Sequence, residues 1–173
     1  IKAQIAVNQR GGAAARQLID HMGSDTVDRA IDDLIDYTAR RLAGRIRTLG
    51  PGRHSFTTRL DDDGSGDGVA VPLHVTVFVA DGKLHFDFAG TGPQAKGAMN
   101  VPLSALQATL YYCVKALLDP GLLPNAGVFD AVVIEAPAGT IVNPRFPAPV
   151  GARSITCQKI AGAVFGAFRG LLP

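Results

Sequence analysis

Two short runs in the middle of the chain alternate between hydrophobic and polar residues. Every second residue is apolar from position 71 to 79 and again from 84 to 88. This period of two is typical of strands that bury one face. The Asp81-Gly82 dipeptide between the runs is a strong signal for a two-residue turn, because both turn residues need positive φ. The sequence therefore predicts an antiparallel hairpin whose apolar residues pair across the strands, Val79 with Leu84 and Val77 with Phe86.

Other segments repeat their apolar residues every three or four positions, the period of a helix with one buried face. The clearest of these is 26–49, and further helices are predicted over 1–22, 102–118 and 154–172. Gly11 and Gly12 disfavour the middle of the first helix, so a break there stays open. Ser24 or Asp25 is expected to cap the second helix.

The last predicted helix carries glycines at every fourth position, Gly162, Gly166 and Gly170. Such a ridge has no side chains to keep a neighbouring element away. Membrane helices use the same spacing, but Lys159 and other polar residues argue against a span. We expect this ridge to pack against another helix, in this chain or in a partner.

Two more strands are predicted over residues 54–60 and 131–136. The elements together predict an α+β fold, in which an antiparallel sheet with the central hairpin is packed by about four helices. Residues 1–173 are expected to form a single domain, or a fragment of a larger subunit, because the chain starts inside a predicted helix.

Composition narrows the function classes. Of the 173 residues, 47% are hydrophobic and 18% charged, which is globular rather than disordered composition. The net charge of +2 has no basic block behind it, so no nucleic-acid partner is expected. Cys113 and Cys157 lack C-x-x-C spacing and are predicted to be reduced thiols within helices. That usage favours a cytoplasmic protein, and no membrane association is expected.

The end of the hairpin is the first candidate binding region. A glycine-rich turn and a polar loop separate the second strand from the helix that opens at Pro102. We expect Asp87, Thr91 and Asn100 to lie there beside free backbone N–H groups, an arrangement typical of small-molecule pockets. The alternative is that the glycines serve only the turn.

Arg153 is the second candidate, at the start of the last predicted helix. Its guanidinium can bind a carboxylate or a polarised carbonyl through two hydrogen bonds. The alternative is an exposed arginine in the first turn of the helix.

Signals for other chemistry are weak. The four histidines lack the spacing of a zinc site. The acidic loop 61–68 starts like a calcium loop, but Pro72 stands where the last acidic ligand is required. We therefore interpret it as a solvated loop, with calcium as the second choice, and predict no metal site. Ser154 and Cys157 lack a nucleophile signature, and no phosphate-binding glycine motif indicates nucleotide binding within this segment.

Several motifs, taken in chain order, resemble the hydantoinase B/5-oxoprolinase family. The stretch 87–94, Asp-Phe-Ala-Gly-Thr-Gly-Pro-Gln, and the following 100–103, Asn-Val-Pro-Leu, are similar to the "DFTGTSPQ…NxPL" pattern of that family. The resemblance covers essentially the whole chain and continues through the following segments: 60–64, 111–112, 117–120, 124–127, 143–144, 149–153 and 158–160. Ala89 and Gly92 depart from the usual Thr and Ser, and residues 151–154 replace a Gly-Gly-Asn type of sequence.

The resemblance implies an enzyme subunit that acts with a hydantoinase A-like partner in a hetero-oligomer. The partner is expected to bind ATP and Mg²⁺, and any further divalent metal is expected outside this segment. The implied reaction is ATP-dependent hydrolytic opening of a small cyclic amide such as a hydantoin or 5-oxoproline. Phosphorylation of the amide oxygen gives the resonance-stabilised carbonyl a good leaving group.

Family members are several-fold longer than this chain, so the resemblance places it in their middle-to-C-terminal portion. Asp87 and Arg153 are predicted to be catalytic, and Thr91, Asn100 and Asn125 to bind substrate. Asn125 has a turn role as its alternative. Two other functions stay open. One is a subunit like those of acetone carboxylase, and the other is a scaffold whose catalytic residues lie elsewhere.

Overall fold

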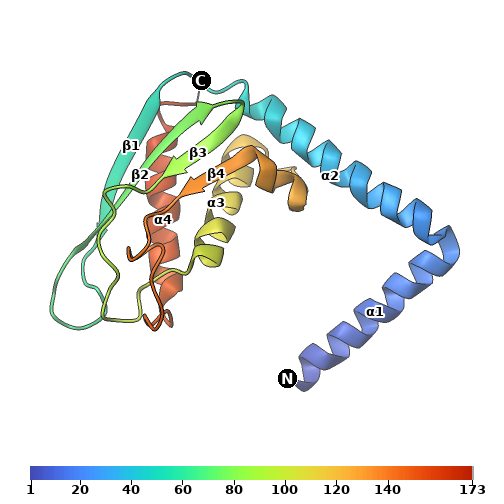
Figure 1. Ribbon diagram of the computed structural model, residues 1–173, viewed down its shortest axis with the longest axis horizontal. Coiled ribbons are helices and arrows are strands. Elements are labelled where there is room, and N and C mark those ends of the chain that lie inside the picture. Colours follow the sequence, from blue (N-terminus) through green and yellow to red (C-terminus); the bar gives the residue numbers. More distant parts are fainter. Residues whose placement is uncertain (173) are drawn as a thin grey trace. The chain divides into compact units, whose positions relative to one another are not determined.

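The protein is described over residues 1–172 by a computed structural model. Its elements follow the order α1 (Lys2–Met22), α2 (Ser24–Ile46), β1 (Arg53–Leu60), β2 (Val71–Ala80), β3 (Lys83–Asp87), α3 (Leu103–Leu118), η1 (Ala126–Ala131), β4 (Val132–Glu135) and α4 (Arg153–Phe168). The α+β class and the four α-helices are as predicted (Figure 1). A short 3₁₀ helix, η1, had no sequence signal that we recognised.

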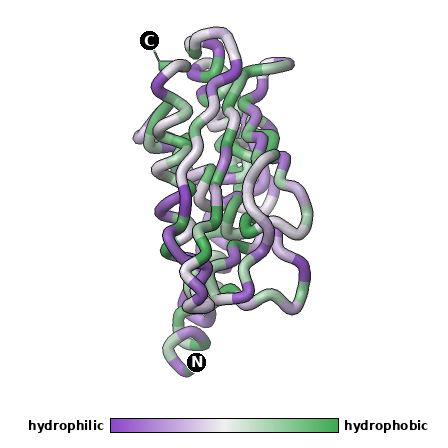
Figure 2. The backbone as a smooth tube through the Cα atoms, turned by 90° about the vertical axis from the view of Figure 1, so that its left-hand side faces the viewer, coloured by the Kyte–Doolittle hydropathy of each residue, from purple (hydrophilic) through white to green (hydrophobic). Residues whose placement is uncertain are grey.

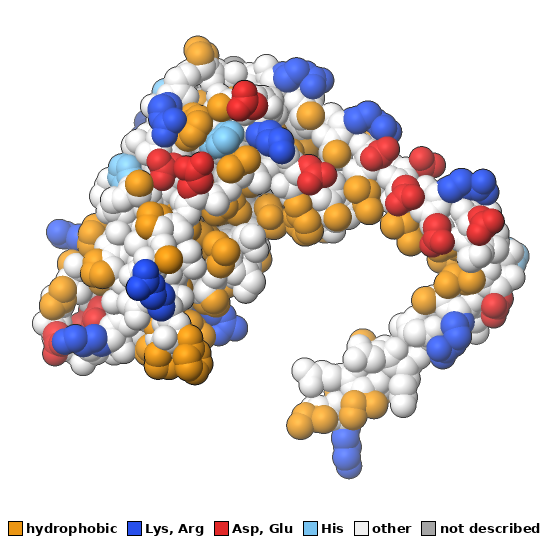
Figure 3. Space-filling model, viewed as in Figure 1, with side chains coloured by type: hydrophobic (Ala, Val, Ile, Leu, Met, Phe, Trp, Pro, Cys, Tyr) orange, Lys and Arg blue, Asp and Glu red, His pale blue; other side chains and the backbone are white. Residues whose placement is uncertain are grey.

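The chain divides into two compact units, Ile1–Tyr37 and a larger one that begins at Thr38. In the first unit, α1 runs through Gly11-Gly12 without a break, and Gly23 ends it with a φ of 81°. None of the described residues of α1 is buried. Hydrophobic side chains are exposed along it and along the first half of α2, among acidic and basic ones (Figure 3). Ser24 is the first residue of α2 rather than its cap.

The larger unit contains the sheet, in which the strands follow the order β1-β2-β3-β4. The predicted hairpin register is confirmed, since Val77 pairs with Phe86 and Val79 with Leu84. Asp81 and Gly82 have the positive φ values, 52° and 73°, that a turn of this kind requires.

An entirely antiparallel sheet is a wrong prediction, because β4 pairs with β3 in parallel. Parallel neighbours need a long crossover connection, and α3 lies in the segment between β3 and β4. The four residues of β4 contain no sign of their direction. The sheet is therefore mixed.

One face of the sheet forms the core. The residues that point to this face are almost fully buried, namely Val71, Leu73, Val75 and Val77 of β2 with Leu84 and Phe86 of β3. Helix α4 packs against β1 and β2. Phe168 of α4 lies 6.2 Å from Phe86 of β3, ring centroid to ring centroid. In turn α3 packs against α4 (Figure 1). The last part of α2 adds Leu42 and Ile46 to the same core.

The described helices include none that is long and apolar enough to cross a membrane. Hydrophilic and hydrophobic residues alternate along the chain at short intervals (Figure 2). This pattern is what elements need when one face packs in a core and the other faces water.

The glycine ridge of α4 packs on a strand, so the expected helix partner is wrong. A Cβ added at Gly166 would lie 2.5 Å from Cδ2 of Phe56 in β1, and one at Gly170 would overlap the ring of His54. Among residues 1–172, no atom of another element lies within 4 Å of a Cβ added at Gly162. The second and third glycines therefore permit a close approach of helix and sheet, and the first does not contribute to it.

This difference predicts opposite effects of two matched substitutions. Gly166→Ala is expected to lower the free energy of unfolding by about 1–2 kcal/mol, because the Phe56 ring must move. Gly162→Ala is expected to raise it by about 0.5–1 kcal/mol, because alanine favours the helix and meets no neighbour. Urea unfolding of both variants checks this, and equal stabilities would contradict the packing on β1.

Candidate functional site

A buried amide organises the loop that follows β3. The side chain of Asn100 is fully buried. Its Oδ1 accepts a hydrogen bond of 2.8 Å from the backbone N–H of Ala95, and Nδ2 donates to the carbonyls of Ala95, Gly97 and Pro149 at 2.9, 3.1 and 3.0 Å. The loop after β3 is thereby tied to the segment that leads into α4.

Two further bonds hold the first turn of α4 against the same loop. The backbone N–H of Ala152 donates to the carbonyl of Ala98 at 2.9 Å. The buried hydroxyl of Thr156 donates to the carbonyl of Met99 at 2.6 Å. Ala152 and Thr156 stand on either side of Arg153 in the chain, so these hydrogen bonds fix the backbone position of Arg153.

Arg153 lines a hollow of about 440 Å³ between the first turns of α3 and α4. The other lining residues are Ala105, Ala108, Thr109, Gly151, Ser154 and Cys157. The guanidinium is exposed, and its Nη1 donates to the carbonyl of Val150 at 3.2 Å. No ion pair joins Arg153 to another described residue.

The chemistry of this hollow is that of an anion or oxyanion site. It contains a cation without a carboxylate partner among the described residues, the hydroxyl groups of Thr109 and Ser154, and a thiol. A guanidinium with free N–H groups binds carboxylates and oxyanions. In the described part of the chain no histidine or carboxylate lines the hollow, so Ser154 and Cys157 have no general base beside them there. The arrangement suits the binding and polarisation of a substrate more than nucleophilic attack on it.

Asp87 and Thr91 lie elsewhere and do not line this hollow. The buried hydroxyl of Thr91 donates to the carbonyl of His74 at 2.9 Å and accepts from its N–H at 3.1 Å, which ties the glycine turn to β2. Asp87 accepts from the N–H of Ala89 at 2.8 Å and forms an ion pair with Arg53 at 3.7 Å.

Asp87 and its ion-pair partner Arg53 lie on the outer face of the sheet, among aromatic and polar side chains. The Arg53 guanidinium lies 3.7 Å from the ring centroid of Phe78, and that ring stacks on His85 with 4.8 Å between centroids. His74 is hydrogen-bonded through Nδ1 to the hydroxyl of Thr57 at 2.8 Å. His74 and His85 thus stand on the outer face of the sheet. Within residues 1–172, no group of three or more His, Cys, Asp or Glu side chains could hold a metal ion.

Asn125 caps η1. Its Oδ1 accepts from the N–H of Gly127 at 3.0 Å, and its Nδ2 donates to the hydroxyl of Thr38 at 2.9 Å. This is the turn role left open from the sequence. The structure therefore brings Asn100 and Arg153 into one region, and places Asp87, Thr91 and Asn125 in others.

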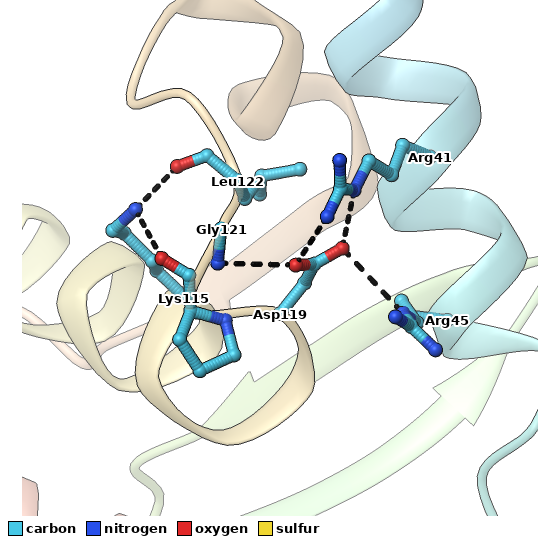
Figure 4. A network of polar contacts seen from close by, with 7 residues as sticks. Arg41, Arg45, Lys115, Asp119, Gly121 and Leu122 are labelled. Carbon is cyan, nitrogen blue, oxygen red and sulfur yellow. Dashed lines mark hydrogen bonds and ion pairs between the residues drawn. The ribbon is translucent and has the colours of Figure 1, made fainter.

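Sequence reasoning missed a polar network around Asp119 (Figure 4). This carboxylate is almost fully buried and accepts from Nε and Nη2 of Arg41 at 2.5 and 2.7 Å. Arg45 adds a longer contact of 3.5 Å. The hydrogen bonds from Arg41 lower the pKa of Asp119 to about 2. Asp119 stands in the segment 117–120, for which the sequence predicted no ion pair.

Asp63 was also missed, because it lies in the loop interpreted as solvated. Its carboxylate is buried and accepts from the N–H of Ser65 at 2.8 Å and of Lys96 at 3.2 Å. The hydrogen bonds with Ser65 lower the pKa of Asp63. A Cβ on Gly97 would overlap the backbone of Gly64. This loop is thus packed on the segment that Asn100 holds.

Comparison with solved structures identifies this fold in larger enzymes. An ATP-dependent caprolactamase from Pseudomonas jessenii matches 99% of the chain with a TM-score of 0.86 at 24% sequence identity, and the match covers 30% of that protein. The nucleotide-free structure of an acetone carboxylase matches 89% of the chain with a TM-score of 0.78 at 14% identity, over 22% of its length. At these identities the likeness concerns the fold.

Comparison of the amino-acid sequence assigns the chain to a family. A family model described as hydantoinase B/oxoprolinase matches residues 1–173, and the chain belongs to this family. A protein from Pseudomonas sp. (strain NS671) that is named as a D-/L-hydantoinase subunit is 31% identical over 100% of the chain and 31% of its own length. 5-Oxoprolinase 1 of Arabidopsis thaliana is 29% identical over 98% of the chain and 14% of its own length. The chain thus spans less than a third of these relatives.

Proposed function

We propose that this chain is the part of a hydantoinase B/oxoprolinase-type subunit that binds the substrate during ATP-dependent opening of a cyclic amide. Membership of the family and the names of its relatives, a hydantoinase subunit and a 5-oxoprolinase, support the class of reaction. The ATP-dependent caprolactamase, whose fold this chain shares, acts on a lactam by name. A hydantoinase A-like partner would supply the ATP and Mg²⁺ site.

The observation that carries the proposal is the guanidinium of Arg153, which has no ion-pair partner among residues 1–172, in the hollow between α3 and α4. An amide carbonyl gains negative charge on oxygen as its carbon is attacked. A cation that is already in place stabilises this charge more than it stabilises the ground state. In 5-oxoproline the same group would bind the carboxylate.

The other predicted residues take supporting roles in this proposal. Asn100 holds the start of α4, and thus the position of Arg153, through its bond to Pro149. Asp87, Thr91 and Asn125 bond to neighbouring elements of this chain. We propose that these four brace the fold around the site rather than contact the reacting atoms.

A matched pair of substitutions on α4 tests the role of Arg153. In the complete subunit with its partner, Arg153→Ala is expected to lower kcat/KM for ring opening by about 100-fold, because a preformed oxyanion contact is lost. Arg153→Lys is expected to recover part of this. Arg169→Ala, at the exposed other end of the helix region, should leave activity near that of the wild type. Coupled assays of ADP release with hydantoin, 5-oxoproline and caprolactam as substrates give the measurement.

The same assay separates the alternatives. Full activity of Arg153→Ala would leave the segment as a scaffold. ATP hydrolysis that depends on bicarbonate and a ketone, with no turnover of cyclic amides, would favour the reaction of acetone carboxylase, whose fold this chain also shares.

A further inference from the structure

A second hollow, of about 430 Å³, lies beside η1 on an adjacent face of α3, and Ala108 lines both this hollow and that of Arg153. Four residues of α3 line it at the spacing of a single helix face: Ala108, Tyr111, Tyr112 and Lys115. The loop after α3 and the residues of η1 form the opposite wall. This volume is within the range of small-molecule sites, which are mostly apolar with a few polar groups.

The walls are aromatic and suit a flat ligand. The rings of Tyr111 and Phe129 stack with 4.8 Å between centroids and 29° between planes. Tyr112 and Phe129 are 62% and 52% exposed, so they form an open rim rather than a filled core. Burial raises the pKa of Tyr111, which keeps its phenol neutral. Aromatic faces stack with planar groups of the same kind.

The hollow also has a charge preference. Lys115 is the one charged residue among its described lining residues, and no ion pair joins this ammonium group to a described carboxylate. Its Nζ donates to the carbonyls of Pro120, at 2.8 Å, and Leu122, which leaves one of its three N–H groups (Figure 4). The adjacent carboxylate, Asp119, is occupied by Arg41 and Arg45.

These contacts also fix the shape of the hollow. The bond from Lys115 to Leu122 ties the helix face to a residue of the opposite wall. Asn125, another lining residue, is held by its bonds to Thr38 and Gly127. Both the cation and the aromatic wall are therefore in place before a ligand arrives, which lowers the entropy cost of binding.

We propose that this hollow is a binding site for a flat, mostly apolar organic anion, whose rings lie against Tyr111 and Phe129 and whose anionic group pairs with Lys115. The residues that would bind this ligand do not line the hollow of Arg153, which shares only Ala108 with this one, and the proposal does not depend on the proposed function.

Two dyes that differ only in charge test the proposal. 8-Anilinonaphthalene-1-sulfonate has a flat apolar body and a sulfonate, and N-phenyl-1-naphthylamine is the same body without the charge. Titration of the 173-residue chain, followed by fluorescence, is expected to show tighter binding of the sulfonate, and added salt should weaken it.

Substitutions test whether the dye binds in this hollow and whether Lys115 pairs with its sulfonate. Ala126→Trp, at an exposed residue that lines the hollow, is expected to abolish binding of both dyes, whereas the same change at the exposed Ala14 of α1, which does not line the hollow, should not. Lys115→Met should weaken the sulfonate about tenfold and the neutral dye less than about twofold, with Lys159→Met as the control. Circular dichroism verifies that each variant is folded.

Two results would overturn the proposal. Unchanged affinity for both dyes in Ala126→Trp would put the dye on another apolar surface. An equal loss of both dyes in folded Lys115→Met would remove the anion preference and leave an apolar slot for a side chain of a partner protein.

Discussion

Asn100→Leu is expected to lower the free energy of unfolding by about 3–5 kcal/mol. The substitution leaves one N–H and three carbonyls without the partner that the amide supplies. Each unsatisfied buried group costs about 1–3 kcal/mol, and the larger apolar side chain recovers only part of the total. Urea unfolding at neutral pH, followed by circular dichroism, gives the difference from the wild type.

The loss of stability caused by a second substitution, Asn100→Asp, is expected to depend on pH. The new carboxyl has nearly the same shape, but its ionised form faces the carbonyl oxygens of Ala95, Gly97 and Pro149. Burial and these oxygens raise its pKa in the folded state above the unfolded value of about 4. The loss of stability relative to the wild type is therefore smallest below that pH and grows as the pH rises.

A matched substitution controls for the change of residue type. Asn8→Asp makes the same chemical change on the exposed surface of α1 and is expected to alter stability by less than about 0.5 kcal/mol. If Asn100→Asp were equally mild at pH 7, the buried network would not hold the loop against Pro149.

Asp119→Asn is the second large effect and is expected to lower Tm by several degrees. The neutral amide cannot pair with the Arg41 guanidinium, whose two bonds at 2.5 and 2.7 Å connect α2 to the end of α3. One of the two amide positions also presents N–H groups to the N–H groups of the arginine. Asp130→Asn, at an exposed aspartate without a hydrogen bond or ion pair among the described residues, should change Tm little.

The pH dependence of the wild type follows from the same contact. Folding lowers the pKa of Asp119 from its ordinary value of 3.8 to about 2. A depressed pKa contributes stability above the unfolded value, and this contribution is lost as the pH falls from about 4 towards 2. Thermal unfolding between pH 7 and pH 3 is expected to show a steeper acid loss in the wild type than in Asp119→Asn. Parallel curves would contradict the role of this ion pair.

The hairpin shows how far sequence reasoning reached. The alternation of residues 71–79 and the turn at Asp81-Gly82 predicted a register that the structure confirms. The direction of β4 could not be predicted, because a run of four residues does not show which way its strand pairs with a neighbour. The glycine ridge was recognised, but its partner was not, since a smooth helix face accepts a strand or a helix equally well.

For the candidate site, too, the sequence pointed to some residues, while their contacts became visible only in the fold. Arg153 was predicted to be catalytic from the chemistry of its side chain and its place at the start of a helix, and this stays a prediction. Asn100 was predicted to bind substrate, and its bonds to the loop and to Pro149 became visible only in the fold. Asp119 had no chemical signal at all, because its partners Arg41 and Arg45 stand 78 and 74 residues away along the chain.

The sequence by itself determined the hairpin, the four helices and the family, because each depends on residues that are near neighbours along the chain or on motifs in fixed order. Only the tertiary structure decided which side chains meet. Asn100 and its acceptor Pro149 are 49 residues apart, and Arg41 and Asp119 are 78 apart. Such pairs form because the burial of the sheet's apolar face brings α2, α3 and α4 together, and no local pattern records that result.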